Sequence, residues 1–220
     1  MKSLKLFMLL VAAMAAPAAM AAGDASAGQE KAAACAACHG QDGNSPSGEY
    51  PSLAGQGAPY LVKQLQEFKS GTRNNPIMMG MTAGLSEQDM EDIAAYYAKQ
   101  TPVPGQADPE LVEQGERLYR GGDMEKGIPA CSGCHGPAGQ GVEAAGFPAL
   151  AGQHVDYLEA QLKAFRVAGR EDIGDNLATR DNDPQAMMRT IAGKMSDGQI
   201  QAVSSFLSGL SAAESGAGEE

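Results

Sequence analysis

The apolar positions along the chain recur with the spacing of α-helices, and they do so twice. In the first half, Leu61, Leu65 and Phe68 are separated by four and then three residues, which places them on one face of a helix. The same spacing and residue types recur in the second half, at Leu158, Leu162 and Phe165. Alternation of apolar and polar positions, which marks a half-buried strand, is almost absent. The pattern predicts an all-α protein.

Helix-start signals predict a terminal helix in each half. Ser86 precedes Asp89, and Ser196 precedes Gln199, with the three-residue spacing of a capping box. Each box is followed by apolar residues at helical spacing, which are Met90, Ile93, Ala94 and Tyr97 in the first half and Ile200, Val203, Leu207 and Leu210 in the second.

The two halves also match each other residue by residue. Residues 51–56, PSLAGQ, align with residues 148–153, PALAGQ. Further identical pairs in the same register are Tyr60 and Tyr157, Leu61 and Leu158, Gln64 and Gln161, Leu65 and Leu162, Phe68 and Phe165, and Arg73 and Arg170. The capping boxes align only after about 13 extra residues are placed between Arg170 and Met188 of the second half. The chain is therefore predicted to be a duplicated domain.

The seam between the repeats lies in residues 101–108, where two prolines and a glycine interrupt the helical periodicity. The predicted domains are residues 22–102 and 109–210, joined by a linker over residues 103–108. The acidic residues 211–220 are expected to form a flexible tail.

The first 21 residues have the organisation of an export signal. Lys2 and Lys5 form a positive start, residues 6–16 are apolar, and residues 19–21, AMA, form a cleavage site. The apolar run is too short to span a bilayer, so a cleaved signal peptide over residues 1–21 is favoured over an uncleaved anchor. Export would place the chain in the periplasm, an oxidising compartment in which disulfides are the default expectation for cysteines.

Composition and charge narrow the range of functions. Sixteen basic and 27 acidic residues give a net charge of −11, which becomes −13 when Lys2 and Lys5 are removed with the signal. Basic residues form no cluster, so nucleic acid is not an expected partner. Aromatic residues make up only 5% of the chain and Trp is absent, so two small domains lack large apolar side chains unless a cofactor supplies apolar surface.

Each half contains one C-x-x-C-H motif, and together the motifs comprise Cys35, Cys38, His39, Cys131, Cys134 and His135. This motif is the attachment signature of c-type haem. Two thiols three residues apart can bond the two vinyl groups on one edge of a porphyrin, and the adjoining histidine then lies beneath the ring, where it can bind iron. The sequence therefore predicts two haem sites, one in each half.

Three other interpretations of the four cysteines are weighed against haem attachment. A structural zinc site needs four ligands, which the chain can provide only if both halves meet at one metal. Thioredoxin-like dithiols require a parallel sheet that the pattern does not predict. Simple disulfides leave the paired histidines unexplained.

The second iron ligand is expected to be methionine. Aligning the two capping boxes places Met78 on Met188, whereas Met79, Met81 and Met187 each fall on a residue of another type. A thioether opposite a histidine fills both axial positions and raises the reduction potential. Methionines that fill gaps in the core are the alternative, and within the cluster Met79 or Met81 could replace Met78.

Two prolines are candidates for orienting the motif histidines. Pro51 and Pro148 lie 12 and 13 residues after His39 and His135. From there a backbone carbonyl can accept a hydrogen bond from the imidazole Nδ1–H and fix the tautomer of the ligand. A turn-starting role is the alternative for both prolines.

Three further residues have expected structural roles. Gly28 and Gly115 lie in helices predicted over about residues 25–35 and 109–119, where a missing side chain lets the terminal helix cross closely. A flexible loop position is the alternative for both glycines. His154 is the only histidine outside the motifs, and a position at the surface or at a helix start is expected for it.

These residues resemble the cytochrome c superfamily, and the duplicated arrangement resembles the two-haem cytochrome c4 family. The resemblance covers nearly all of the chain after the signal, including both haem motifs and residues 51–56. It implies two tandem cytochrome c-like helical domains related by a pseudo-twofold axis, with the haem carboxylates at their interface. It also implies two haem c groups held covalently by Cys35, Cys38, Cys131 and Cys134, with one iron bound by His39 and Met78 and the other by His135 and Met188.

The resemblance further implies a periplasmic carrier of single electrons rather than an enzyme. Electrons would arrive from a quinol-oxidising respiratory complex and leave to a haem-copper terminal oxidase. The alternatives are the cytochrome subunit of a periplasmic flavoprotein dehydrogenase and, less favoured, a dihaem peroxidase. The acidic chain is expected to be a monomer that docks weakly on a basic patch or through an apolar haem edge, with loose membrane association also left open.

Overall fold

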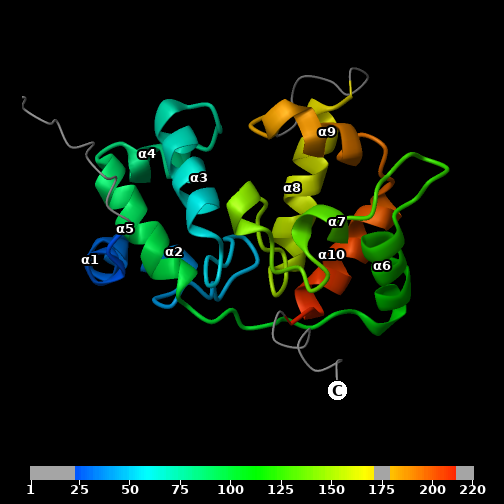
Figure 1. Cartoon of the computed structure of the whole chain (residues 1–220), viewed down its shortest axis with the longest axis horizontal. Helices are drawn as coiled ribbons and strands as arrows, with labels where there is room; N and C mark the ends of the chain where they lie inside the picture. Colours follow the sequence, from blue (N-terminus) through cyan, green and yellow to red (C-terminus); the bar gives the residue numbers. More distant parts are fainter. Residues whose placement is uncertain (1–22, 171–178, 212–220) are drawn as a thin grey trace, which may run out of the picture.

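The computed structural model describes residues 23–170 and 179–211, which form two helical domains side by side (Figure 1). The first domain contains α1 (Ala25–Lys31), η1 (Ala32–Ala34), α2 (Ala36–His39), α3 (Ala58–Ser70), α4 (Pro76–Thr82) and α5 (Glu87–Ala98). The second contains α6 (Pro109–Gly121), α7 (Ser132–His135), η2 (Glu143–Ala145), α8 (Val155–Ala168), η3 (Pro184–Ala186), α9 (Met187–Ala192) and α10 (Asp197–Gly209).

The predicted all-α class with two tandem domains is confirmed. Within the described ranges the only β-structure consists of two isolated bridges, Asp123 with Ile128 and Val142 with Phe147. No helix in this part of the chain is long and apolar enough to cross a membrane. The predicted signal peptide and the acidic tail from residue 212 onward lie outside the described residues.

Both terminal helices begin at the predicted capping boxes. The Ser86 hydroxyl accepts a hydrogen bond from the Asp89 N–H at 3.1 Å, and the Asp89 carboxylate accepts one from the Ser86 N–H at 2.9 Å. Ser196 and Gln199 form the same reciprocal pair at 3.3 and 3.1 Å. These bonds satisfy backbone donors that the first turn of a helix leaves free, so α5 and α10 start at fixed points.

The first helix of each domain crosses the terminal helix at a glycine. A Cβ atom on Gly28 of α1 would lie 1.9 Å from the Asp92 carbonyl oxygen of α5. A Cβ on Gly115 of α6 would lie 2.2 Å from the Ala202 carbonyl oxygen of α10. No side chain fits either gap, so the predicted close crossing is confirmed and the loop alternative is wrong for both glycines.

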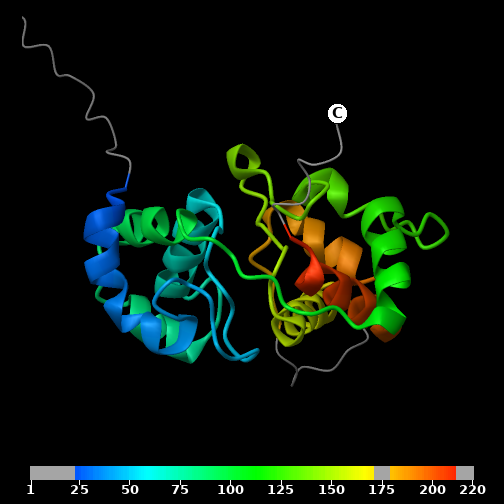
Figure 2. The ribbon, with the colours of Figure 1, turned by 90° about the horizontal axis from the view of Figure 1, so that it is seen from below.

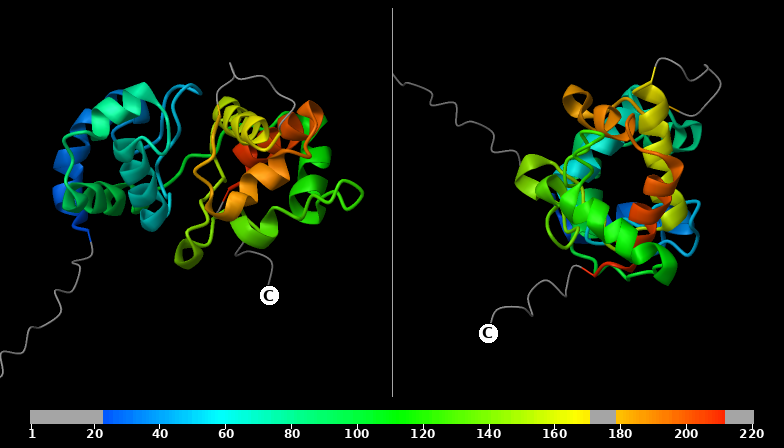
Figure 3. Two further views of the ribbon diagram at one scale, coloured as in Figure 1. Left: turned by 90° about the horizontal axis from the view of Figure 1, so that it is seen from above. Right: turned by 90° about the vertical axis from the view of Figure 1, so that its right-hand side faces the viewer.

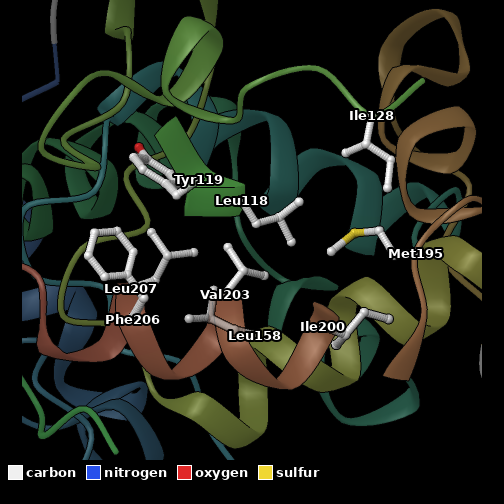
Figure 4. Close-up of a cluster of buried hydrophobic side chains, with 9 residues drawn as sticks. All are labelled: Leu118, Tyr119, Ile128, Leu158, Met195, Ile200, Val203, Phe206 and Leu207. Carbon is white, nitrogen blue, oxygen red and sulfur yellow. The ribbon is translucent and has the colours of Figure 1, made fainter. Parts of the chain in front are cut away.

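Each domain has its own apolar core. In the second domain the buried side chains come mainly from α6, α8 and α10 (Figure 4), and they are Leu118, Tyr119, Ile128, Leu158, Met195, Ile200, Val203, Phe206 and Leu207. In the first domain they are Ala32, Leu61, Ile93, Ala94 and Tyr97. The first cysteine of each motif, Cys35 or Cys131, packs at the margin of its core. Each haem motif is therefore anchored beside a core built from the predicted apolar stripes.

The two domains lie against each other along α3 and its surroundings. Residues 101–108 have no regular secondary structure and cross from one domain to the other along one side of the molecule (Figure 2). The short helix η2 of the second domain packs against α3 of the first, and Figure 3 shows the two helical groups meeting there while remaining distinct. The contact surface is therefore separate from the two cores.

A reciprocal pair of arginines joins the domains. Each guanidinium donates to a glutamine of its own domain and to a tyrosine of the other domain. Arg73 donates to Gln64 at 2.7 Å and to Tyr157 at 3.0 Å. Arg180 donates to Gln161 at 3.0 Å and to Tyr60 at 2.9 Å. Each guanidinium also stacks on a phenylalanine of its own domain, with centroid distances of 4.6 Å to Phe68 and 4.5 Å to Phe165. The two arginines therefore occupy equivalent positions.

This geometry corrects the alignment of Arg73 with Arg170. The side chain of Arg170 instead donates to the carbonyl oxygens of Gly193 and Met195 within the second domain. The true equivalent is Arg180, because its backbone N–H bonds Ala164 as that of Arg73 bonds the equivalent Glu67. The alignment failed because it continued the register past the end of α8, where the extra residues begin. The segment 171–178 lies within this insertion and outside the described residues.

Candidate haem sites

Each C-x-x-C-H motif ends in a short helical turn, α2 or α7, that stops at a glycine with positive φ. The exit glycines are Gly40, with φ 79°, and Gly136, with φ 80°. Residues three apart lie on the same face of a helical turn, so the two thiols of each motif lie on one face. None of the four thiols forms a disulfide. This arrangement suits two thioether bonds to one edge of a flat macrocycle.

The thiols lack the properties of the competing sites. Burial raises the pKa of the Cys35 thiol and raises that of Cys131 to about 11. The attacking thiol of a thioredoxin-like centre has a lowered pKa, and neither Cys35 nor Cys131 has this property. In residues 23–170 and 179–211, no three Cys, His, Asp or Glu side chains gather as a metal-binding group, so the four cysteines do not share a zinc site.

Both motif histidines are buried and held by one ring nitrogen. His39 Nδ1–H donates to the Pro51 carbonyl oxygen at 2.8 Å, and His135 Nδ1–H donates to the Pro148 carbonyl oxygen at 2.9 Å. Burial lowers the pKa of both imidazoles, and the hydrogen bond to proline only partly opposes this shift. Each ring is therefore neutral with its proton on Nδ1, which leaves the Nε2 lone pair available to a metal.

The methionine of the first domain lies on α4, whose backbone is fixed around it. The Asn75 side chain caps the helix by accepting from the Met78 N–H at 3.0 Å, and the Thr82 hydroxyl donates to the Met78 carbonyl oxygen at 2.8 Å. Met78 is half-buried, whereas Met79 and Met81 are 37% and 43% exposed. Of these three side chains, Met78 is the best-placed candidate for an internal ligand.

The methionine of the second domain follows an unusual stretch of backbone. Gln185 and Ala186 have φ values of 53° and 57°, which are uncommon for residues with a side chain. Asp183 then holds the start of α9, because its carboxylate accepts from the Arg189 N–H at 3.0 Å and from its Nε–H at 2.7 Å. Met187 and Met188 are both half-buried, so exposure does not choose between them. The equivalence with Met78 favours Met188.

The surroundings of each motif fit an apolar macrocycle. Like the first motif cysteine, further half-buried apolar side chains pack at the margin of each core, and they include Leu53, Leu65 and Leu85 in the first domain and Leu150, Leu162 and Ile191 in the second. The two thiols, the buried histidine and the half-buried methionine of each domain are the types of donor that a His/Met-ligated haem c requires.

Comparison with known proteins agrees with this geometry. The profile of the cytochrome c family matches the chain twice, over residues 25–100 and 112–211. Cytochrome c4 of Pseudomonas aeruginosa is 50% identical over 188 residues, which cover 86% of this chain and 89% of that protein. The chain belongs to the cytochrome c4 family. Cytochrome c4 proteins are dihaem electron carriers. Because this chain contains two cytochrome c domains, it has two covalently bound haem c groups.

Two further relatives extend the cytochrome c4 comparison. The crystal structure of reduced recombinant cytochrome c4 from Pseudomonas stutzeri matches 86% of this chain and 100% of that chain, with a TM-score of 0.77 and 49% identity. A protein of Thiomonas intermedia named thiosulfate dehydrogenase electron acceptor is 41% identical over 207 residues, which cover 91% of this chain and 89% of that protein.

Some residues around the cytochrome c4 sites escaped the sequence analysis. His154 occupies the N-cap position of α8, in line with the expected helix start, and its Nε2–H donates to the Ser45 carbonyl oxygen of the other domain at 2.9 Å. Gln56 and Gln153 bridge the domains as well. Their identity in the two PxLAGQ segments was the available signal, but the repeat alone does not show that the partners lie in opposite domains.

Proposed function

We propose that this cytochrome c4 carries single electrons in the periplasm through two equivalent haem sites. Cys35, Cys38, Cys131 and Cys134 form the thioether bonds, His39 and Met78 bind one iron, and His135 and Met188 bind the other. The observation that carries this proposal is the pair of buried histidines, each with its Nδ1–H bonded to a proline carbonyl oxygen, which leaves Nε2 to bind a metal.

The residues of the chain hold each site in a fixed arrangement. Haem iron bound by these residues would supply the one-electron chemistry. The Pro51 and Pro148 carbonyls fix the tautomer and the rotation of the imidazoles, so the ligands keep one orientation in both states. With Met78 and Met188 as ligands, the iron would have no open site for dioxygen or peroxide, which favours electron transfer over peroxidase or other enzyme chemistry.

Each domain would bind one haem. Residues 22–102 and 109–210 form the two monohaem domains, residues 103–108 link them, and residues 1–21 are a signal peptide that directs export. The duplicated cytochrome c profile and the separate cores support this division.

The partners are redox proteins that dock transiently on a monomeric carrier. A quinol-oxidising complex as donor and a terminal oxidase as acceptor suit a respiratory carrier with high-potential His/Met sites. A periplasmic dehydrogenase is a second candidate donor, favoured by the relative named thiosulfate dehydrogenase electron acceptor. Stopped-flow reduction by each purified donor would distinguish the two, because the physiological donor should react much faster at equal driving force.

The ferric visible spectrum tests the ligand assignment. The purified protein should contain two covalent haems, each with the weak red charge-transfer band of methionine bound to ferric iron. Met78→Ala and Met188→Ala should each remove half of this band, because each deletes one sulfur ligand. Met79→Leu and Met81→Leu are the matched controls and should leave it intact. A full band in Met78→Ala would reject that ligand, and rapid peroxide turnover by the unaltered protein would favour an enzyme instead.

A further inference from the structure

One peptide unit in the first domain connects its axial histidine to the other domain. The Pro51 carbonyl oxygen accepts from His39 Nδ1–H at 2.8 Å. The Ser52 N–H belongs to the same planar amide and donates to the Oε1 atom of Gln153, in the second domain, at 2.9 Å. Gln153 completes a two-point contact, because its Nε2–H donates to the Ser52 carbonyl oxygen at 2.8 Å.

The second domain repeats this arrangement in the opposite direction. The Pro148 carbonyl oxygen accepts from His135 Nδ1–H at 2.9 Å. The Ala149 N–H of the same amide donates to Gln56 Oε1, in the first domain, at 2.9 Å, and Gln56 Nε2–H donates back to the Ala149 carbonyl oxygen at 2.9 Å. Each histidine is thus joined through one amide to a glutamine of the opposite domain.

Both glutamines are built into the interface rather than lying on its surface. Gln56 and Gln153 are only 7% and 8% exposed. Each Oε1 atom also accepts from the next backbone N–H of its own chain segment, Gly57 at 3.0 Å and His154 at 3.1 Å. These bonds fix which end of each side-chain amide is the acceptor, so a carbonyl oxygen faces each proline amide.

Hydrogen bonds in such a chain strengthen one another. When an amide N–H donates to a good acceptor, negative charge shifts onto its own carbonyl oxygen, which then accepts more strongly. A stronger bond from Nδ1–H increases the basicity of a metal-bound imidazole. A more basic imidazole stabilises ferric iron relative to ferrous iron and so lowers the reduction potential.

We propose that Gln153 and Gln56 are crossed positioning residues, each of which strengthens the axial histidine of the opposite domain. Gln153 acts on His39 through the Pro51–Ser52 amide, and Gln56 acts on His135 through the Pro148–Ala149 amide. Each glutamine lowers the potential of the haem that its own domain does not bind. This inference rests on the proposed axial role of the two histidines.

The test uses the holoprotein and a potential measured separately for each haem. Redox titrations followed by NMR of the haem methyl groups give both potentials in one sample. Gln153→Leu should raise the potential of the N-terminal haem more than that of the C-terminal haem, and Gln56→Leu should do the reverse. The hyperfine-shifted Nδ1–H resonance of the histidine in the opposite domain should move with the potential.

Matched controls separate this effect from a loosened interface. Gln161→Leu and Gln64→Leu also delete an interfacial glutamine, but these side chains bond the two arginines and not a proline amide. These variants should change the reduction potentials of the two haems without the crossed pattern. Equal shifts of both haems in Gln153→Leu, or a larger shift in the haem of its own domain, would overturn the inference.

A second variant keeps the test decisive if a leucine variant does not fold. Gln153→Glu retains an oxygen acceptor for the Ser52 N–H and makes it anionic. The reduction potential of the N-terminal haem should therefore fall more than that of the C-terminal haem. An unchanged difference between the two potentials in this variant would also overturn the inference. Failure of the unaltered chain to bind haem through both histidines would instead reject the proposed function, so the two failures are distinguishable.

Discussion

The two domains fill the same place in their cores from opposite helices. In the first domain a buried tyrosine, Tyr97, extends from the terminal helix α5 toward Ala32, next to the end of α1. In the second domain Tyr119 extends from the first helix α6, and the terminal helix α10 carries Leu207. The Gly28 and Gly115 crossings fix these equivalences.

Both phenols lie beside the first cysteine of their motif. Burial, followed by the nearby Cys35 or Cys131 thiol, raises the pKa of Tyr97 and Tyr119 well above the usual range. The Tyr119 hydroxyl donates to the Gly136 carbonyl oxygen, whereas the Tyr97 hydroxyl faces the Cys35 thiol. The duplication has therefore kept an aromatic ring next to the haem attachment site without keeping the position that supplies it.

The domains also differ in how the first helix is tied to the last. In the first domain Asp92 of α5 accepts from Lys31 Nζ at 2.6 Å and from the Asp24 N–H at 2.8 Å. The equivalent residue of α10 is Ala202, which provides no such bonds. The first domain thus reinforces the crossing with an ion pair, whereas in the second domain the start of α6 instead bonds a neutral hydroxyl of α10, because the Asp108 N–H donates to Ser205 Oγ at 2.8 Å.

Moving the buried tyrosine from position 97 to position 32 should give the largest change in the free energy of unfolding. Tyr97→Leu should lower the free energy of unfolding by about 2 to 3 kcal/mol because it leaves a cavity. Ala32→Tyr should lower it by about 1 to 3 kcal/mol because the larger side chain overpacks the core. The double variant copies the second domain and should cost about 2 kcal/mol less than the sum. Chemical denaturation of the holoproteins measures these values. Strict additivity would show that the two positions do not share one space.

The reciprocal arginines offer a test of the corrected equivalence. Arg180→Lys removes a planar guanidinium that bonds both domains and should weaken their contact by about 1 to 3 kcal/mol. Limited proteolysis within residues 103–108 should consequently become faster, and Arg73→Lys should act alike. Arg170→Lys is the matched control, since its bonds stay within the second domain. Similar proteolysis of all three variants would contradict the equivalence of Arg73 and Arg180.

Lowering the pH should produce the smallest of these changes in stability, mainly in the first domain. Lys31 and the Asp24 N–H hold the pKa of Asp92 below its ordinary value of 3.8. An acid with a lowered folded-state pKa stabilises the fold above about 3.8, and this stabilisation is lost as the pH falls further. Asp92→Asn should flatten the pH dependence of the unfolding midpoint below about pH 4.

The second domain supplies a control for the acid prediction. Asp197 also has a lowered pKa, mainly through its hydrogen bond with Arg166, but its side chain is 80% exposed and solvent screens it. Asp197→Asn should therefore change the pH dependence less than Asp92→Asn. A larger effect of Asp197→Asn would remove the proposed contrast between the domains.

Much of the fold and of the candidate sites was predictable because it depends on local spacing. Capping boxes, apolar stripes and the two C-x-x-C-H motifs each lie within a few residues of chain, where helix geometry alone decides which groups meet. The repeat added the equivalence of Met78 and Met188, because duplicated segments preserve register until an insertion interrupts it.

The sequence by itself thus determined the helical class, the duplication and the two haem-attachment motifs. Only the tertiary structure decided that Arg180 takes the place of Arg73, that an aromatic ring comes from different helices, and that Gln153 faces the amide beside His39. The physical reason is sequence distance: these partners lie on separate elements or in separate domains, and the packing of whole helices brings them together. Local periodicity carries no information about such pairings.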